Sequence, residues 1–247
     1  MKQKTARPDG ELVYGINPLV ELIQAKRRKL LAIYTTKPTP KSWDKIERLI
    51  AGKGIQISYV DRDVLTRMAG TPDHQGVVAW AQPFIYRKKP FDTERQKRIV
   101  LLDGIQDPRN VGAILRSIYC TGFDGVIIPV RGAAPVNATA LKSSAGLAEH
   151  LEIYCPPSSQ AAVQELEKAG YSIYLALFNG QSATSVSYQA PLCVVIGSEG
   201  AGISPALVKK GIPVTLPQIN ATVSYNASVA AGILLFLVAT QQGAIKQ

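Results

Sequence analysis

The sequence predicts an α/β protein with a small α/β domain at the N-terminus and a larger C-terminal domain built on a mostly parallel sheet. Short apolar runs alternate with helical patterns along nearly the whole chain. In the second half these runs are apolar on both faces, which is typical of strands that helices cover on both sides. With 247 residues, 46% of them hydrophobic, the chain is long enough for one large domain or two modest ones.

A basic, polar tail at residues 1–10 precedes the first domain, which we place at residues 11–81, and we expect the tail to be flexible. A short apolar segment opens the domain, and a helix follows with Asn17 as its N-cap and Pro18 as its first residue. The further elements expected here are strands at 30–36, 54–60 and 76–81, and helices over 43–50 and from residue 63.

Residues 82–98 are polar and basic and contain two prolines, so they read as a linker between domains. A long surface loop within one domain is the alternative. The C-terminal domain then spans residues 99–247. Its expected strands are 99–105, 124–129, 151–155, 171–178, 190–197 and 214–217, and its expected helices are 110–122, 137–149, 160–169, 205–210 and 228–241.

Charge is distributed unevenly between the two halves. Residues 1–98 contain 20 Lys and Arg against 10 Asp and Glu, whereas residues 99–247 contain 8 of each kind. This asymmetry indicates a polyanionic partner for the N-terminal part, although a lysine-rich surface that only confers solubility is the alternative. The densest basic clusters are Lys26, Arg27, Arg28 and Lys29, followed by Arg87, Lys88 and Lys89.

Composition also excludes several classes of protein. No apolar stretch is long enough for a membrane span, and the basic N-terminus lacks the apolar region of a secretory signal. Three widely spaced cysteines and two histidines predict neither a disulfide framework nor a metal site. We therefore expect a cytoplasmic protein without a bound metal.

Three loops at the ends of expected strands are rich in polar residues and glycine: 103–116, 197–202 and 216–232. In parallel sheets such loops build the ligand site. The phosphate-binding pattern G-x-x-x-x-G-K-[ST] is missing, and GSEGAG at 197–202 does not match G-x-G-x-x-G. Because Glu199 within this loop would repel a pyrophosphate, the pattern points away from ATP and NAD.

These loops resemble the three motifs of the SpoU/TrmH branch of the SPOUT RNA 2′-O-ribose methyltransferases. DGIQDPRNVGAILR is similar to the first motif, VIGSEGAGIS to the second and LPQINATVSYNASVAAGILLF to the third. In the N-terminal part, YGINPLVELI and HQGVVA resemble the substrate-binding domain of members that act on large-subunit rRNA. The resemblance covers nearly the whole chain, with several motifs in the same order and at similar spacing.

The resemblance implies a C-terminal domain with a deep trefoil knot, S-adenosylmethionine as cofactor, and a homodimer with the site near its interface. The implied reaction is methyl transfer to a ribose 2′-hydroxyl of RNA, with a guanosine of large-subunit (23S) rRNA as the leading substrate. A tRNA ribose methyltransferase, a resistance enzyme that modifies the ribosome, and a non-catalytic RNA-binding ribosome assembly factor are the alternatives. The two basic clusters are then the expected RNA contacts.

The resemblance also assigns site residues. Those matching the family's catalytic positions are Asn110, Arg116, Glu199, Ser224 and Asn226, and those matching its cofactor-binding positions are Gly197, Leu216, Tyr225 and Asn226. Taken singly, each polar residue has a simpler explanation, such as a helix cap for Asn110 or an arginine lying along an apolar helix for Arg116. Tyr225 and Gln218 depart from the family's usual leucine and methionine. Arg116 is open to two roles, base or phosphate clamp, and its permanently charged guanidinium favours the clamp.

Overall fold

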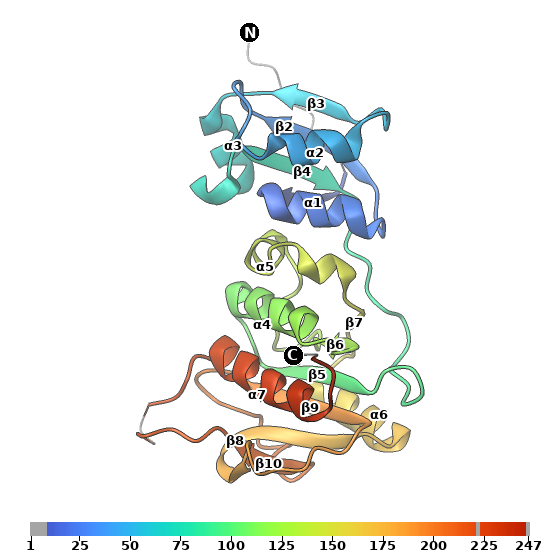
Figure 1. The fold of residues 1–247 in the computed structure, drawn as a ribbon, viewed down its shortest axis with the longest axis vertical. Coiled ribbons are helices and arrows are strands. Elements are labelled where there is room, and N and C mark those ends of the chain that lie inside the picture. Colours follow the sequence, from blue (N-terminus) through green and yellow to red (C-terminus); the bar gives the residue numbers. More distant parts are fainter. Residues whose placement is uncertain (1–8, 221–222, 246–247) are drawn as a thin grey trace. The chain divides into compact units, whose positions relative to one another are not determined.

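The computed structural model describes residues 9–220 and 223–245 and divides them into two compact units (Figure 1). Unit 1 contains the chain up to Ile85 together with Val136–His150, and unit 2 contains Tyr86–Pro135 and the chain from Leu151 onward. Most of the tail expected at residues 1–10 lies outside the described residues. Within the described residues, no helix is both long enough and apolar enough to cross a membrane.

Unit 1 is built on a four-stranded sheet in the order β1-β4-β2-β3. Strand β4 pairs antiparallel with both β1 and β2, whereas β2 and β3 are parallel. The elements are β1 (Glu11–Tyr14), α1 (Ile16–Ala25), β2 (Leu30–Thr35), α2 (Trp43–Ile50), β3 (Gln56–Tyr59), α3 (Arg62–Ala69), the 3₁₀ turn η1 (Pro72–His74) and β4 (Val77–Ala81). The small N-terminal α/β domain is thereby confirmed. The expected cap is wrong, because α1 begins one residue before Asn17 and Gly15 is its N-cap, with a φ of 97°.

The segment 136–150 joins unit 1, although it lies far along the chain. We expected one helix over 137–149, but the structure has a short helix α5 (Ala138–Ser143) and a 3₁₀ turn η2 (Leu147–His150). The break falls at Ala145 and Gly146, which both have positive φ. A Cβ on Gly146 would lie 2.7 Å from the Cα of Pro18, so only glycine fits against α1.

Unit 2 is built on a six-stranded sheet in the order β10-β8-β9-β5-β6-β7. Its described strand pairings are all parallel, which confirms the fold class expected for the C-terminal domain. The elements are β5 (Arg98–Asp103), α4 (Pro108–Cys120), β6 (Gly125–Ile127), β7 (Ile153–Tyr154), α6 (Ser159–Ala169), β8 (Ser172–Ser182), β9 (Leu192–Gly197), β10 (Ile212–Thr215) and α7 (Ala227–Gln241). The helix expected at 205–210 is wrong, since successive turns occupy these residues.

The core of unit 2 includes a buried cluster between the sheet and helix α6. Side chains of α6 pack with Ile99 and Leu101 of β5 and with Cys193 and Val195 of β9 in one buried cluster. Helices α4 and α7 pack against each other, as Figure 1 shows. Helix α7 is apolar around its whole circumference, which fits a helix that is covered on more than one side.

Two aromatic residues hold the basic segment 82–98. Phe84 and Phe91 are buried, and Phe91 belongs to the buried cluster of unit 2. A Cβ on Gly125 would lie 2.4 Å from the Phe91 ring, so β6 needs a glycine where this ring packs. The segment therefore contributes to the core despite its polar composition.

Candidate functional site

Three polar side chains from separate parts of the chain converge in unit 2. Asn110 Nδ2 donates a hydrogen bond of 2.8 Å to Glu199 Oε1, and Asn226 Nδ2 donates to the same oxygen. Asn226 Nδ2 also lies 3.3 Å from Asn110 Oδ1. The structure thus brings together three of the five residues expected to be catalytic, although 89 residues separate Asn110 from Glu199.

Helix caps fix the two asparagines. Asp107 accepts a hydrogen bond from the backbone N–H of Arg109 and, with Pro108 in the first turn, begins α4, so that Asn110 lies near the start of this helix. Asn226 is the N-cap of α7, and its Oδ1 accepts from the backbone N–H of Ser228 at 2.9 Å. The amide oxygen of Asn226 therefore caps α7, and its NH₂ group donates to Glu199.

Glu199 lies on a tight loop at the end of β9. Ser198 and Gly202 close this loop with two backbone hydrogen bonds of 3.0 and 2.9 Å. A Cβ on Gly197 would lie 2.3 Å from the backbone carbon of Gly202, so the loop's own backbone requires glycine at this position. Glycine is therefore needed at position 197 for the loop to fold, whether or not Gly197 also contacts a ligand.

Buried Asp103 ties this loop to the neighbouring strand. Asp103 ends β5 and is in register with Gly197 of β9, so the first two polar loops start side by side. Its Oδ2 accepts from the backbone N–H of Ser204 at 2.7 Å, and its Oδ1 accepts from Ser159 Oγ at 2.6 Å. We did not single out Asp103 from the sequence, where it reads as the polar end of an apolar run.

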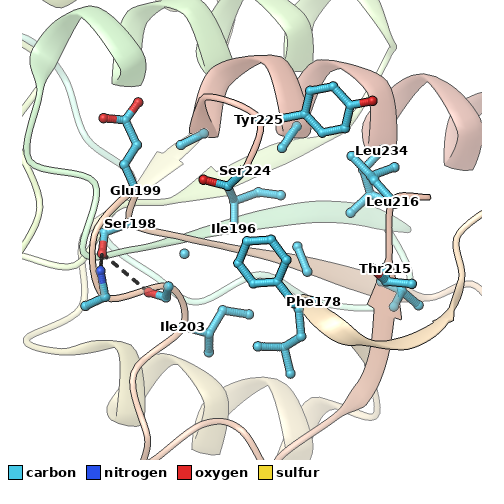
Figure 2. Close-up of a pocket in the computed structure, with 18 of the residues that line it drawn as sticks. Phe178, Ile196, Ser198, Glu199, Ile203, Thr215, Leu216, Ser224, Tyr225 and Leu234 are labelled. Carbon is cyan, nitrogen blue, oxygen red and sulfur yellow. Dashed lines mark hydrogen bonds between the residues drawn. The ribbon is translucent and has the colours of Figure 1, made fainter. Parts of the chain in front are cut away.

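A first pocket of about 300 Å³ opens between the middle of β8, the ends of β9 and β10 and the first half of α7 (Figure 2). Five residues expected in the site line it: Gly197, Glu199, Leu216, Ser224 and Tyr225. Phe178 lines it as well, with its ring in the middle of the view although 62% of the residue is exposed. Phe178 carries no distinct signal in the sequence, because an aromatic residue in an apolar run reads as strand core.

A second pocket of about 430 Å³ adjoins the first. The loop from Gly104 to Asp107, together with Asn110, forms one side of it. The two pockets share a wall consisting of residues 198–201 and Ala227. Figure 2 shows the Glu199 side chain directed away from the Phe178 ring, which lies inside the first pocket. Glu199 therefore stands at the boundary between the two pockets.

The environment of Glu199 is polar, and no cation among the described residues pairs with it. Two amide groups donate to its Oε1, and within the described chain Glu199 forms no ion pair. Its Oε2 is left with lone pairs to accept a further hydrogen bond. In the same described residues, no group of three His, Cys, Asp or Glu side chains is arranged to hold a metal ion.

Arg116 is not part of this cluster. It is exposed and lines neither pocket. Because it follows Asn110 by six residues on α4, it lies about 9 Å further along the helix axis and on a different face. Within one chain, the geometry keeps Arg116 away from Glu199.

The residues of the two basic clusters differ in how exposed they are. Arg28 is buried, with its side chain 1% exposed, and its Nη2 lies 2.5 Å from Glu149 Oε1. Its Nη1 donates to the backbone oxygen of Gln82 at 2.8 Å, and the guanidinium lies over the Phe84 ring. This burial argues against a contact between Arg28 and RNA.

Arg87 is also engaged within its own unit. Its Nε donates to the backbone oxygen of Lys89 at 2.8 Å, and its Nη1 lies 3.3 Å from Glu152 Oε2. Arg27 is half-buried, whereas Lys26, Lys29, Lys88 and Lys89 are exposed. The last four side chains are therefore the expected RNA contacts that this structure leaves accessible.

Two family models match the chain. The SpoU rRNA Methylase family matches residues 97–236, and the model described as RNA 2′-O ribose methyltransferase substrate binding matches residues 12–87. The first covers the three loops of the site, and the second covers most of the N-terminal part.

Relatives extend over nearly the whole chain. A Mycolicibacterium gilvum protein with the name "Uncharacterized tRNA/rRNA methyltransferase" is 35% identical over 95% of this chain and 77% of its own. A Bacillus subtilis protein whose name assigns it to the TrmH family of tRNA/rRNA methyltransferases is 30% identical over 92% of this chain and 94% of its own.

Solved structures share the fold. An AdoMet-bound rRNA methyltransferase from Sinorhizobium meliloti superimposes with a TM-score of 0.77 at 18% identity, covering 96% of this chain and 88% of that one. The SpoU methyltransferase AviRb from Streptomyces viridochromogenes, in complex with AdoMet, has a TM-score of 0.78 at 22% identity, covering 95% and 91%.

Proposed function

We propose that this chain, which belongs to the SpoU rRNA methylase family, transfers a methyl group from S-adenosylmethionine to a ribose 2′-hydroxyl of RNA. The observation that carries the proposal is the position of Glu199, held by two asparagine amides at the boundary between two adjoining pockets. Such an arrangement would suit two reactants, one in each pocket, that meet at a carboxylate.

The first pocket suits the cofactor. Its lining combines apolar side chains, such as Phe178 and Leu234, with the loop at residues 197–202 and with residues 214–216 at the end of β10. S-adenosylmethionine supplies, when bound, a methyl group that its sulfonium already activates. Gly197, Leu216 and Tyr225 would hold it through backbone groups, so a tyrosine at 225 is compatible with this role.

The second pocket suits the target nucleotide, with its ribose at the shared wall. The free Oε2 of Glu199 would accept the hydrogen bond of the 2′-hydroxyl and take its proton as the oxygen becomes methylated. Asn110 and Asn226 keep the carboxylate in place, and Ser224 lines the first pocket. Positioning of this kind contributes on the order of 7–11 kcal/mol in favourable cases.

In a homodimer, Arg116 of one subunit would contribute to the site of the other. Helix α7 presents an apolar stripe, in which Val229, Ile233 and Phe236 are 48%, 38% and 54% exposed, and it packs beside α4, which carries Arg116. An exposed stripe of this kind is suited to a second copy of the chain. We propose that Arg116 of the partner subunit clamps the RNA phosphate next to the target ribose.

Mixing two inactive variants tests this arrangement. If the site takes Arg116 from the partner subunit, Arg116→Ala and Glu199→Ala chains refolded together restore about a quarter of wild-type activity, because half of the dimers are mixed and each has one complete site. No restoration would mean that Arg116 acts within its own chain, whereas an active Arg116→Ala chain on its own would mean that Arg116 is not needed.

The RNA would be large-subunit (23S) rRNA, with a guanosine as the target and the cytoplasm as the location. The match of residues 12–87 to a substrate-binding model of RNA 2′-O ribose methyltransferases supports an RNA-binding role for the N-terminal part. The basic excess of residues 1–98 supports it as well.

We also propose that the C-terminal chain forms the trefoil knot of the family. Strand β10 lies at one edge of the sheet, and the chain then returns to form α7, which packs against α4 and β9. This return path is the feature that supports the proposal.

The experiment uses purified protein, S-adenosylmethionine with a labelled methyl group, and rRNA and tRNA from cells that lack the gene. We expect label in alkali-resistant dinucleotides, because a 2′-O-methyl group protects the adjacent phosphodiester bond from alkaline cleavage. Glu199→Ala should remove this label. Label found only on bases, or no transfer to either RNA, would contradict the proposed function.

A further inference from the structure

The second pocket carries one more inference, which rests on the proposed function. We propose that it holds the base of the target nucleotide and that Asp107 selects guanine there. The pocket, at about 430 Å³, lies in the size range of small-molecule sites. Since it shares the Glu199 wall with the first pocket, a nucleotide bound in the second pocket with its ribose at that wall would place its base against the remaining lining, which includes Asp107.

Among the described residues, the charged side chains that line this pocket are two carboxylates. The carboxylates of Glu199 and Asp107 and the amide of Gln106 line it together with the backbone of residues 104 and 105. No lysine or arginine lines the pocket in the part of the chain that the structure describes. A phosphate would be repelled here, whereas a base that presents N–H groups would be bound.

Asp107 has acceptor capacity left after its structural role. Its Oδ1 accepts from the backbone N–H of Arg109 at 2.8 Å, and the Nε of that arginine is 3.9 Å away. The side chain is 46% exposed, and an ionised carboxylate has about four lone-pair sites. Most of these sites remain free to accept from a ligand.

Guanine is the base that matches a carboxylate. Its Watson–Crick edge presents two neighbouring donors, N1–H and the N2 amino group, which can bind one carboxylate in a bidentate manner. Adenine, cytosine and uracil each place an acceptor beside their donor on this edge, and the carboxylate would repel that acceptor. Asp107 thereby becomes a determinant of base specificity.

The simpler explanation is that Asp107 only begins α4, and the substitution Asp107→Asn separates the two roles. Asparagine caps helices as well as aspartate does, so its Oδ1 can still accept from the N–H of Arg109. Its second atom becomes an NH₂ donor, which opposes the donors of guanine. The matched control is Asp92→Asn, because Asp92 also accepts backbone N–H groups in a turn and lines neither pocket.

The experiment is methylation of rRNA and tRNA from cells that lack the gene, followed by digestion to nucleosides and mass spectrometry. Calorimetry with S-adenosylmethionine on each variant checks the first pocket. We expect 2′-O-methylguanosine from the wild type and from Asp92→Asn. For Asp107→Asn we expect a rate of its formation that is lower by about tenfold or more, as is typical when one bidentate pair with a base is broken, with cofactor affinity unchanged.

Three outcomes would overturn the inference. A wild-type product that is 2′-O-methyluridine, -cytidine or -adenosine would do so while the proposed function stands. An Asp107→Asn variant that forms 2′-O-methylguanosine at the wild-type rate would also reject it, again without affecting the proposed function. No 2′-O-methylnucleoside of any kind from the wild type would overturn both.

Discussion

Two glutamates, one in each unit, are both held by nitrogen donors but in opposite surroundings. Glu149 of unit 1 has a side chain 2% exposed and pairs with the buried guanidinium of Arg28. Glu199 of unit 2 is exposed, receives two neutral amide donors and borders two pockets. A buried charge that is fully paired serves the fold, whereas an unpaired carboxylate with a free oxygen beside a pocket is available for chemistry.

The difference also shows how far a basic cluster in a sequence predicts the residues that contact a polyanion. Lys26 to Lys29 form the densest basic cluster of the chain, yet its third member is buried against a carboxylate 121 residues away. Local charge density therefore indicates an electrostatic partner for a region, but it does not identify the side chains that touch it. Four variants, from the largest expected effect to the smallest, test this comparison.

Removing the charge of Arg28 should have the largest effect. Arg28→Met leaves Glu149 buried without its partner, and we expect a loss of about 3–5 kcal/mol in the free energy of unfolding of unit 1. Both tryptophans, Trp43 and Trp80, are buried in unit 1, so their fluorescence during urea denaturation measures this loss. Lys29→Ala, at an exposed neighbouring position, is the control. Unchanged stability combined with weaker RNA binding would show that Arg28 is an RNA contact after all.

Removing the carboxylate of Glu199 should affect catalysis but not folding. We expect Glu199→Ala to lower the rate of methyl transfer by about 100-fold or more, because the hydroxyl loses its acceptor at the reacting position. Stability should stay within about 0.5 kcal/mol of wild type, since the side chain is exposed. The control Glu94→Ala, in an exposed turn, should retain full activity. A large loss of stability in Glu199→Ala would make this glutamate a structural residue like Glu149.

Truncating Phe178 sharpens the assignment of the two pockets. If its ring stacks on the adenine of the cofactor, Phe178→Ala weakens binding of S-adenosylmethionine about tenfold, as is usual when one aromatic ring is removed from a base. Calorimetry measures the affinity. Val130, which is also exposed and apolar and lines neither pocket, provides the control Val130→Ala. An unaltered affinity would place the adenine elsewhere.

Neutralising exposed lysines should have the smallest effect. We expect Lys88→Ala with Lys89→Ala to weaken RNA binding a few-fold and to reduce its dependence on salt by about 0.7–0.9 in the logarithmic slope for each phosphate that is no longer neutralised. Fluorescence anisotropy over a series of salt concentrations measures both. Substitution of Lys41 and Lys45 by alanine, also at exposed positions, removes the same charge as a control. If the affinity for RNA depends on salt with the same slope in the wild type and in both double variants, Lys88 and Lys89 do not contact RNA.

Much of the fold could be predicted from the sequence because apolar runs mark buried strands directly. The strands overlap the expected ranges, although β8 continues to Ser182, beyond the expected end at 178, and β10 begins at Ile212, two residues before the expected start. The errors fall where local signals conflict: Asn17 has the chemistry of a cap, but the positive φ that only Gly15 tolerates sets the start of α1. At 205–210 the pattern suggested a helix, while Asp103 holds the backbone of Ser204 from another strand.

The candidate site was predictable only through its motifs. Asn110, Glu199 and Asn226 each have a plain local explanation, and their convergence depends on the order of strands in the sheet. Phe178 and Asp107 lacked a distinct signal because strand residues and helix caps are common. Arg28 could not be separated from its neighbours, since its partner Glu149 joins unit 1 through a segment far along the chain.

The most direct test maps 2′-O-methyl groups in rRNA and tRNA from cells with and without the gene. We predict that one guanosine of large-subunit rRNA loses its 2′-O-methyl group when the gene is deleted, that the wild-type gene restores it and that a Glu199→Ala gene does not. Identical ribose methylation of every rRNA and tRNA in both strains would contradict the account.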